Sequence, residues 1–224
     1  MIPLRDENPS HTVPVATYLI FAANIAVFAY QIFLPPTMQQ RFVFAYGAIP
    51  ARFGLDRFPT HIPLDGPWLT LFSSMFLHGS FMHLGGNMLY LWIFGDNVED
   101  AMGHIRFPVF YLLCGLAAAM FQMAAGPESR IPLVGASGAI AGVLGAYTLL
   151  YPTARVRTLI IFLFFVRIVP IPALFILGLW FVIQVVSAPA SAGSGIAFFA
   201  HIGGYLVGML LIGPFVKGKR RRRA

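Results

Sequence analysis

The feature that most constrains this fold is a series of apolar segments long enough to cross a lipid bilayer. Residues 15–34 form a run of 20 residues without a charge, which is the length that a helix needs to span the hydrocarbon core. Of the 224 residues, 58% are hydrophobic and 10% are charged, against about 25% charged in soluble domains. Because the apolar runs are continuous rather than alternating, they predict membrane helices and not a β-barrel.

Six such segments predict a single all-α domain over 1–224, built as a six-helix membrane bundle. The expected spans are 15–34, 81–98, 107–125, 137–152, 170–188 and 196–216. The fourth span is short for a crossing, which predicts either a strong tilt or a start below the membrane surface, beside a cavity. The apolar run 158–166 has only nine residues, so it is expected to lie at the membrane interface.

The charged residues predict how the chain is oriented. Segment 35–77 mixes arginines with aromatic residues, which is typical of an amphipathic loop lying partly in the membrane interface. With six spans, the side holding both termini carries ten Lys/Arg residues and the opposite loops carry four. The positive-inside rule therefore predicts cytoplasmic termini. The basic tail 217–224 is interpreted as an anchor near anionic lipid, not as a nucleic-acid-binding arm.

Polar side chains inside apolar segments are functional candidates by default, and four of them stand out. They are His83, Asn87, Ser137 and His201. His83 and Asn87 are four residues apart and share one helix face. His78 lies just ahead of them and would leave that face on a continuous helix. Taken alone, His83 and Asn87 favour a simpler interpretation, as buried polar residues bonded to a neighbouring helix.

Ser137 and His201 each lie on a helix face made of small residues. These are Ala141 and Gly145 for Ser137, and Gly204 and Gly208 for His201. Small residues allow two helices to approach closely, so packing of the two faces would bring Ser137 within hydrogen-bonding reach of His201. A nucleophile beside a general base is the minimum for activating a serine. Alone, Ser137 also fits a hydroxyl bonded back to its own helix, and His201 a satisfied core histidine.

A carboxylate that orients the histidine is not predicted. The last acidic residue is Glu128, and none occurs in the last three spans. The acidic run 96–100 closes the second span at the end away from the expected position of His201. The sequence therefore predicts a catalytic dyad of Ser137 and His201 rather than a triad with an acid.

The dyad leaves His83, Asn87 and the backbone N–H of Ser137 as candidate oxyanion donors.

The competing interpretation is an ion-binding or transport protein that uses His78, His83 and His201. The sequence contains no His-Glu-x-x-His motif, no Cys/His cluster and no carboxylate inside the last three spans to balance a dication. These absences weigh against a metal-dependent mechanism. A single cysteine provides no disulfide framework.

Motifs on three separate spans occur in one characteristic order. They are His78, His83 and Asn87 on the second span, Gly135-Ala136-Ser137-Gly138 at the start of the fourth, and Ala200-His201-Ile202-Gly203-Gly204 with Gly208 on the sixth. The runs 2–6 and 94–100 add to this pattern. The ordered set resembles the rhomboid intramembrane serine proteases of bacterial type. One Gly-x-Ser-Gly alone is weak, whereas the set covers nearly the whole chain.

The resemblance implies a bundle whose fourth helix opens into an internal water-filled cavity. It implies Ser137 as nucleophile, His201 as general base, and His83 and Asn87 on the oxyanion side. The supporting residues would be His78, Gly135, Gly138, Gly204 and Gly208. Substrates would be transmembrane protein segments with small, helix-breaking residues near the cleaved bond, admitted past the fifth helix. The expected location is a bacterial inner membrane, and the partners are the lipid bilayer and the substrates, without nucleic acid.

Two positions depart from the family pattern. Ala141 stands where many relatives carry an aromatic residue that stacks on the base, and Leu69 follows Trp68 where many relatives carry arginine. The departures affect how His201 is oriented and how the first loop is held. The alternative within the family is a catalytically silent protein that binds membrane clients. Such members lose the serine or the histidine, and both are present here.

Overall fold

The computed structural model describes residues 1–54, 66–162, 165–190 and 196–216, and within them the chain is mostly helical. A helix occupies each of the six apolar segments: α1 (Val15–Phe33), α4 (Phe81–Met102), α5 (Arg106–Ala125), α6 (Ser137–Leu150), α7 (Ala173–Ser187) and α8 (Phe198–Phe215). Of the described helices, α1, α5 and α8 are long and apolar enough to cross a membrane, and α6 and α7 are shorter apolar helices.

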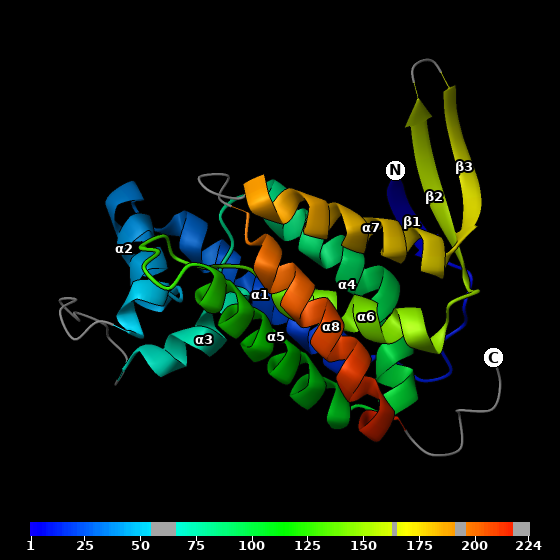
Figure 1. Cartoon of the computed structure of the whole chain (residues 1–224), viewed down its shortest axis with the longest axis horizontal. Coiled ribbons are helices and arrows are strands. Elements are labelled where there is room, and N and C mark those ends of the chain that lie inside the picture. Colours follow the sequence, from blue (N-terminus) through cyan, green and yellow to red (C-terminus); the bar gives the residue numbers. More distant parts are fainter. Residues whose placement is uncertain (55–65, 163–164, 191–195, 217–224) are drawn as a thin grey trace.

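The short helix α6 lies at the centre of the bundle and contacts α4, α5, α7 and α8 (Figure 1). All eleven residues of 138–148 are buried. This stretch consists of glycine, alanine and larger apolar residues apart from Tyr147 and Thr148. Its small residues, Gly138, Gly142 and Gly145 among them, allow neighbouring helices to approach closely on several sides. The sequence of α6 thus accounts for its central position.

Glycines bring α6 and α8 into backbone contact. A Cβ atom added at Gly204 would lie 2.0 Å from the carbonyl oxygen of Gly138. One added at Gly208 would lie 2.0 Å from the carbonyl oxygen of Gly142. No real side chain fits at these distances, so glycine on α8 is what allows the two helices to pack at this separation.

The segment 35–77 is not a plain loop, contrary to expectation. It contains α2 (Pro36–Tyr46), α3 (Thr70–Ser73) and three short 3-10 turns, Pro50–Arg52, Pro67–Leu69 and Ser74–Phe76. Pro36 at the first turn starts α2 because its fixed φ suits a helix and its missing N–H costs nothing there. The charged residues Asp56, Arg57 and Asp65 lie outside the described residues.

The expectation of an all-α fold is wrong at one end of the molecule. Strands β1 (Ile2–Asp6), β2 (Arg155–Phe162) and β3 (Phe165–Pro172) form an antiparallel sheet in the order β1-β2-β3. Ile2 lies opposite Leu159, and Thr158 lies opposite Val169. The short, β-branched run of β2 and β3 favours strands over a helix. The expected fifth span therefore begins with the end of β3, and its helix starts at Ala173.

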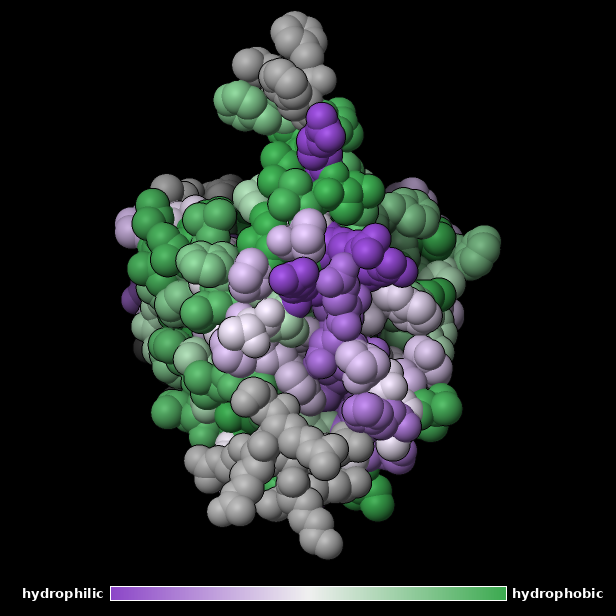
Figure 2. Space-filling model, turned by 90° about the vertical axis from the view of Figure 1, so that its right-hand side faces the viewer, coloured by the Kyte–Doolittle hydropathy of each residue, from purple (hydrophilic) through white to green (hydrophobic). Residues whose placement is uncertain are grey.

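The sheet lies at the opposite end of the bundle from α2 and α3 (Figure 1). Figure 2 views this end directly and shows hydrophilic residues gathered in the middle of the face, with hydrophobic residues around them. The basic tail 217–224 is outside the described residues.

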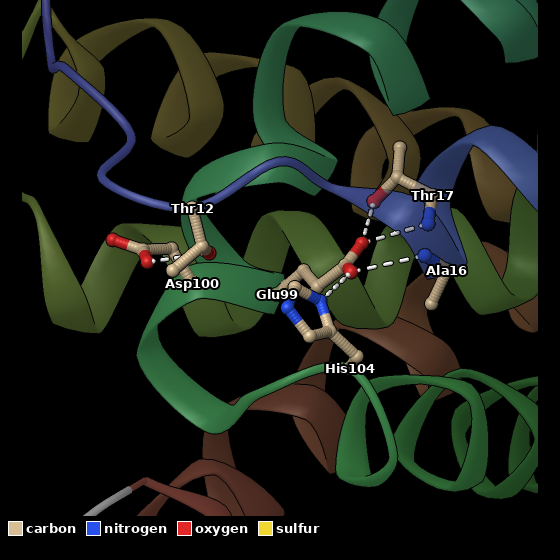
Figure 3. A network of polar contacts seen from close by, with 6 residues as sticks. All are labelled: Thr12, Ala16, Thr17, Glu99, Asp100 and His104. Carbon is tan, nitrogen blue, oxygen red and sulfur yellow. Dashed lines mark hydrogen bonds and ion pairs between the residues drawn. The ribbon is translucent and has the colours of Figure 1, made fainter.

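A buried carboxylate joins α4 to the start of α1 at this end (Figure 3). Glu99 is fully buried. Its carboxylate accepts hydrogen bonds from the backbone N–H groups of Ala16 at 2.9 Å and Thr17 at 2.7 Å. It also accepts from the Thr17 hydroxyl at 2.7 Å and from His104 Nδ1 at 2.6 Å. Next to it, Asp100 accepts from the Thr12 hydroxyl at 2.8 Å. The acidic end of α4 is thus used to hold the N-terminal segment, away from Ser137.

Candidate active site

A pocket of about 900 Å³ lies among the helices, at the end of the bundle where α4, α6 and α8 begin. Residues of α4, α5, α6, α7 and α8 line it, together with the loop before α6. The four polar residues singled out from the sequence all line this pocket: His83, Asn87, Ser137 and His201. The structure therefore brings them together from three separate helices.

The turn before α6 aims Ser137 into the pocket. Gly135 has a φ of +122°, which an L-residue rarely adopts, and its N–H donates to the carbonyl of Ser74 at 2.9 Å. A Cβ atom at Gly135 would lie 2.7 Å from the ring of His83. Glycine is thus required here both by the backbone conformation and by the approach of the histidine. Ser137 follows as the first residue of α6.

Ser137 and His201 are hydrogen-bonded, with 2.8 Å between Oγ and Nε2. They lie on α6 and α8, and are 64 residues apart in the sequence. Gly204 lies one turn after His201, and Gly138 follows Ser137 directly. The close contact between Gly204 and the Gly138 carbonyl therefore sets the distance between the serine and the histidine. Gly138 itself faces α5, where an added Cβ would lie 2.6 Å from that of Ala118.

The second nitrogen of His201 contacts a residue that the sequence analysis missed. Nδ1 lies 2.8 Å from Oε1 of Gln184 on α7. The ring of Trp180, also on α7, lies 5.8 Å from the imidazole with a 38° tilt. Gln184 is a polar residue within an uncharged apolar run, which is the same signal that singled out Asn87.

The polar residues near the start of α4 form a second hydrogen-bonded group. Nδ2 of Asn87 lies 2.9 Å from Nε2 of the fully buried His78. Gln31 of α1 in turn donates to the backbone carbonyl of His78 at 2.8 Å. Because α4 begins at Phe81, His78 precedes the helix, and the chain turns its ring toward Asn87. The rotation expected for a continuous helix therefore does not apply.

His83 presents one nitrogen to the backbone and the other to the pocket side. Its Nδ1 accepts a long hydrogen bond from the N–H of Gly79 at 3.4 Å. A nitrogen that accepts is unprotonated, so in the neutral ring Nε2 carries the hydrogen. His83 can therefore act as a hydrogen-bond donor through Nε2, on the side where its ring approaches Gly135.

The two positions that depart from the family pattern, Ala141 and Leu69, differ in burial. Ala141 is buried, and α7 supplies an aromatic neighbour for His201 through Trp180. Trp68 and Leu69 are exposed, and the Trp68 ring packs against Phe53 at 5.2 Å.

These features define a class of protein: a helical membrane protein in which a serine is hydrogen-bonded to a histidine inside a pocket of the bundle. The family follows from sequence comparison. A model of the Rhomboid domain matches residues 65–218, and the chain belongs to the rhomboid family.

Three relatives illustrate how far the similarity extends. The chain is 32% identical over 167 residues to Rhomboid protein 1, mitochondrial, of Saccharomyces cerevisiae, covering 69% of this chain and 45% of that protein. It is 30% identical over 202 residues to presenilin-associated rhomboid-like protein, mitochondrial, of Bos taurus, with coverages of 86% and 46%. It is 32% identical over 133 residues to Rhomboid protease GluP of Bacillus subtilis, with coverages of 59% and 24%. The chain spans less than half the length of each.

Proposed function

We propose that this protein is an intramembrane serine endopeptidase that cleaves transmembrane segments of membrane proteins. The observation that carries the proposal is the 2.8 Å hydrogen bond between Ser137 Oγ and His201 Nε2 at the wall of the pocket. Membership of the rhomboid family supports it, as does similarity to GluP, which is a rhomboid protease by name.

In the proposed reaction, Ser137 and His201 form and then resolve an acyl-enzyme. Ser137 Oγ attacks the scissile carbonyl carbon while Nε2 of His201 accepts the hydroxyl proton. Collapse of the tetrahedral intermediate breaks the peptide C–N bond, and His201 returns the proton to the departing amine. A water molecule then attacks the ester carbonyl and gives a proton to Nε2. The ester C–O bond breaks, His201 returns that proton to Ser137 Oγ, and the carboxyl product is released.

The negative charge on the tetrahedral oxygen requires donors on the opposite side of the reacting carbon. We assign this role to the Nε2–H of His83, the amide of Asn87 and the backbone N–H of Ser137. Ser137 is the first residue of α6, so its N–H has no partner within the helix and lies at the positive end of the helix dipole. Loss of one such donor typically lowers kcat about 10²–10³-fold.

The proposal includes a topology. All six helices of the bundle cross the membrane, and α6, with only 14 residues, begins below the surface so that the pocket admits water. Both termini then lie on one side, the side that carries most of the Lys and Arg residues. The basic tail 217–224 belongs to that side. No metal or cofactor takes part in the steps above.

The direct test is cleavage of a tagged model transmembrane substrate in membranes. The wild type is expected to release a fragment, whereas Ser137→Ala and His201→Ala are expected to be inactive with unchanged expression. Cleavage that persists in either variant would overturn the mechanism.

Fluorophosphonate labelling of purified protein separates the protease from a silent, client-binding member of the family. We expect the wild type to be labelled and Ser137→Ala to be unlabelled. An unlabelled wild type, or equal labelling of the two proteins, would argue for the client-binding alternative.

A further inference from the structure

We propose that Gln184 is the residue that positions His201, in place of the missing carboxylate; this inference rests on the proposed protease function. Gln184 is on α7 and is 7% exposed. Its Oε1 lies 2.8 Å from Nδ1 of His201, opposite the nitrogen that contacts Ser137. The amide, the imidazole and the hydroxyl thus form one hydrogen-bonded chain across α7, α8 and α6.

The direction of this chain follows from the second hydrogen bond of Gln184. Its Nε2 donates to the backbone carbonyl of Trp180 at 3.2 Å, so its Oε1 is the atom that faces the imidazole. An amide oxygen only accepts, which assigns the ring proton to Nδ1 of His201. Nε2 is then left with its lone pair toward the Ser137 hydroxyl, as a general base requires.

The same helix also restrains the plane of the ring. Trp180 is four residues before Gln184 and packs against His201 at 5.8 Å. Ala141 on α6 has no ring with which to do this. A neutral amide beside a neutral imidazole also avoids burying an unpaired charge in an apolar bundle. α7 therefore controls the tautomer and the orientation of the base.

The first experiment compares variants of nearly equal size. Gln184→Met removes the acceptor, and we expect kcat for the model substrate to fall about tenfold or more with little change in KM. Gln184→Glu restores an acceptor and is expected to recover most of that loss. Ile183→Met, on the exposed side of α7, is the control and is expected to cleave like the wild type. Wild-type kcat in Gln184→Met would overturn the proposal.

A second measurement does not depend on cleavage. Nitrogen-15 NMR of histidine-labelled protein reports which ring nitrogen carries the proton, and the His201 signal is assigned by its loss in His201→Ala. The proposal requires protonation at Nδ1 in the wild type and a mixture or reversal in Gln184→Met. Protonation at Nε2 in the wild type would overturn it. An inactive wild type with the Nδ1 tautomer would instead count against the protease function and leave the positioning intact.

A separate observation concerns the hairpin formed by β2 and β3. We propose that its outer half docks at the lipid–water interface of an anionic leaflet beside α7. Figure 1 shows the hairpin running across the direction of the bundle helices rather than along them. In the end-on view it extends beyond the outline of the bundle (Figure 2). An element placed in this way lies along a membrane surface that the helices cross.

The hairpin changes character along its length. Near its base, Val156 and Thr158 are fully buried against the rest of the protein. Farther out, Ile161, Phe162 and Val166 are 59%, 67% and 62% exposed. Ile161 pairs with Val166 and so shares its sheet face, whereas Phe162 points to the other face. A sheet packed on one side alternates apolar and polar residues, so apolar side chains on both faces indicate an apolar environment around these outer residues.

The charges near the hairpin favour lipid as that environment. Arg155, at the base, and Arg167, farther out, form no ion pair among the described residues. The adjoining helix α7 continues the apolar surface with the exposed Leu174 and Phe175. Arginine beside aliphatic and aromatic residues fits a layer of anionic headgroups above acyl chains. Because an open strand edge is not tolerated in hydrocarbon, the hairpin stays at the interface and does not cross.

Spin labels at single cysteines test this placement in nanodiscs of phosphatidylcholine with phosphatidylglycerol. The native thiol is first removed by Cys114→Ala. Labels at Ile161→Cys and Val166→Cys are expected to be more accessible to oxygen than to a water-soluble nickel complex, as for Phe175→Cys on α7. Glu128→Cys, in an exposed loop, is the aqueous control. Without phosphatidylglycerol the hairpin labels are expected to lie at a shallower depth.

Two outcomes would overturn the proposal. Nickel accessibility at 161 and 166 equal to that of Glu128→Cys would place the hairpin in water. Protection from both oxygen and nickel would show that protein covers it, as a second copy or a bound client would. Neither outcome bears on Ser137, so this proposal and the protease function are tested independently.

Discussion

Gly208 allows the close packing of α8 against α6 on which the proposed activity depends. A Cβ atom here would lie 2.0 Å from the Gly142 carbonyl oxygen, so even alanine forces α6 and α8 apart. Overpacking of this kind typically costs about 1–3 kcal/mol. A displacement of about 1 Å between reacting groups typically costs about 10²-fold in rate.

We therefore expect Gly208→Ala to lower cleavage of the model substrate about 10²-fold and to lower the thermal midpoint in detergent. Gly213→Ala is the matched control, because nothing lies within 4 Å of a Cβ atom at that position of the same helix. Its cleavage is expected to match the wild type, and its stability to be equal or higher by up to about 1 kcal/mol, because alanine is the better helix former. Equal effects of the two substitutions would show that the helix contact does not limit activity.

At the scale of single elements, α1 depends on α4 for its N-terminal cap. Pro14, at the capping position, makes no side-chain hydrogen bond to the helix. The carboxylate of Glu99 supplies that function by accepting from the N–H groups of Ala16 and Thr17. An anion at this end of the helix also interacts favourably with the helix dipole.

Glu99→Gln keeps the shape of the side chain but removes acceptor capacity and charge. Because the site is fully buried, at least one donor is left unsatisfied, at a cost of about 1–3 kcal/mol. The thermal midpoint in detergent is expected to fall by roughly 2–4 °C for each kcal/mol. Glu7→Gln, which breaks only the exposed pair with Arg157, is expected to have a much smaller effect. Equal shifts for the two variants would contradict this role of Glu99.

At the scale of the whole molecule, one hydrogen bond ties the N-terminal strand to the central helix. The hydroxyl of Tyr147 on α6 donates to Oδ2 of Asp6 at 2.5 Å. Burial, assisted by the nearby Asp96, raises the pKa of Asp6 to about 6, although the bond from Tyr147 acts in the opposite direction. Protonated Asp6 is therefore favoured in the folded protein relative to the unfolded chain.

The raised pKa of Asp6 fixes the direction in which the stability of the fold changes with pH. The contribution of Asp6 to stability is fully present below its unfolded pKa of about 3.9 and is lost as the pH rises through about 6. Asp6→Asn still accepts from Tyr147 but does not ionise. We expect the variant to gain stability relative to the wild type between pH 4 and pH 7, on the order of 1–2 kcal/mol because the carboxyl is partly exposed.

Thermal unfolding of both proteins across this pH range is the measurement. Glu128→Gln, an exposed acidic residue at the other end of the molecule, is expected to parallel the wild type. A constant difference between Asp6→Asn and the wild type at all pH values would show that Asp6 does not titrate in this window.

The sequence alone determined where the bundle helices lie and which polar groups are candidates for chemistry. Apolar length and small-residue spacing are local properties, readable within one segment at a time. They indicated the short helix α6 and the matched faces of Ser137 and His201. The sheet was missed because the apolar run of β2 is equally compatible with an interfacial segment until its partners are known.

Only the tertiary structure decided how the base is held. A lone Gln184 can bond to its own helix, as its Nε2 does to the Trp180 carbonyl, so its residue type does not reveal a second partner. Whether Oε1 reaches His201 depends on the rotation and offset of α7 against α8. Packing of many side chains sets that geometry, as it sets the turn that carries His78 to Asn87 and the glycine contacts that bring His201 to Ser137.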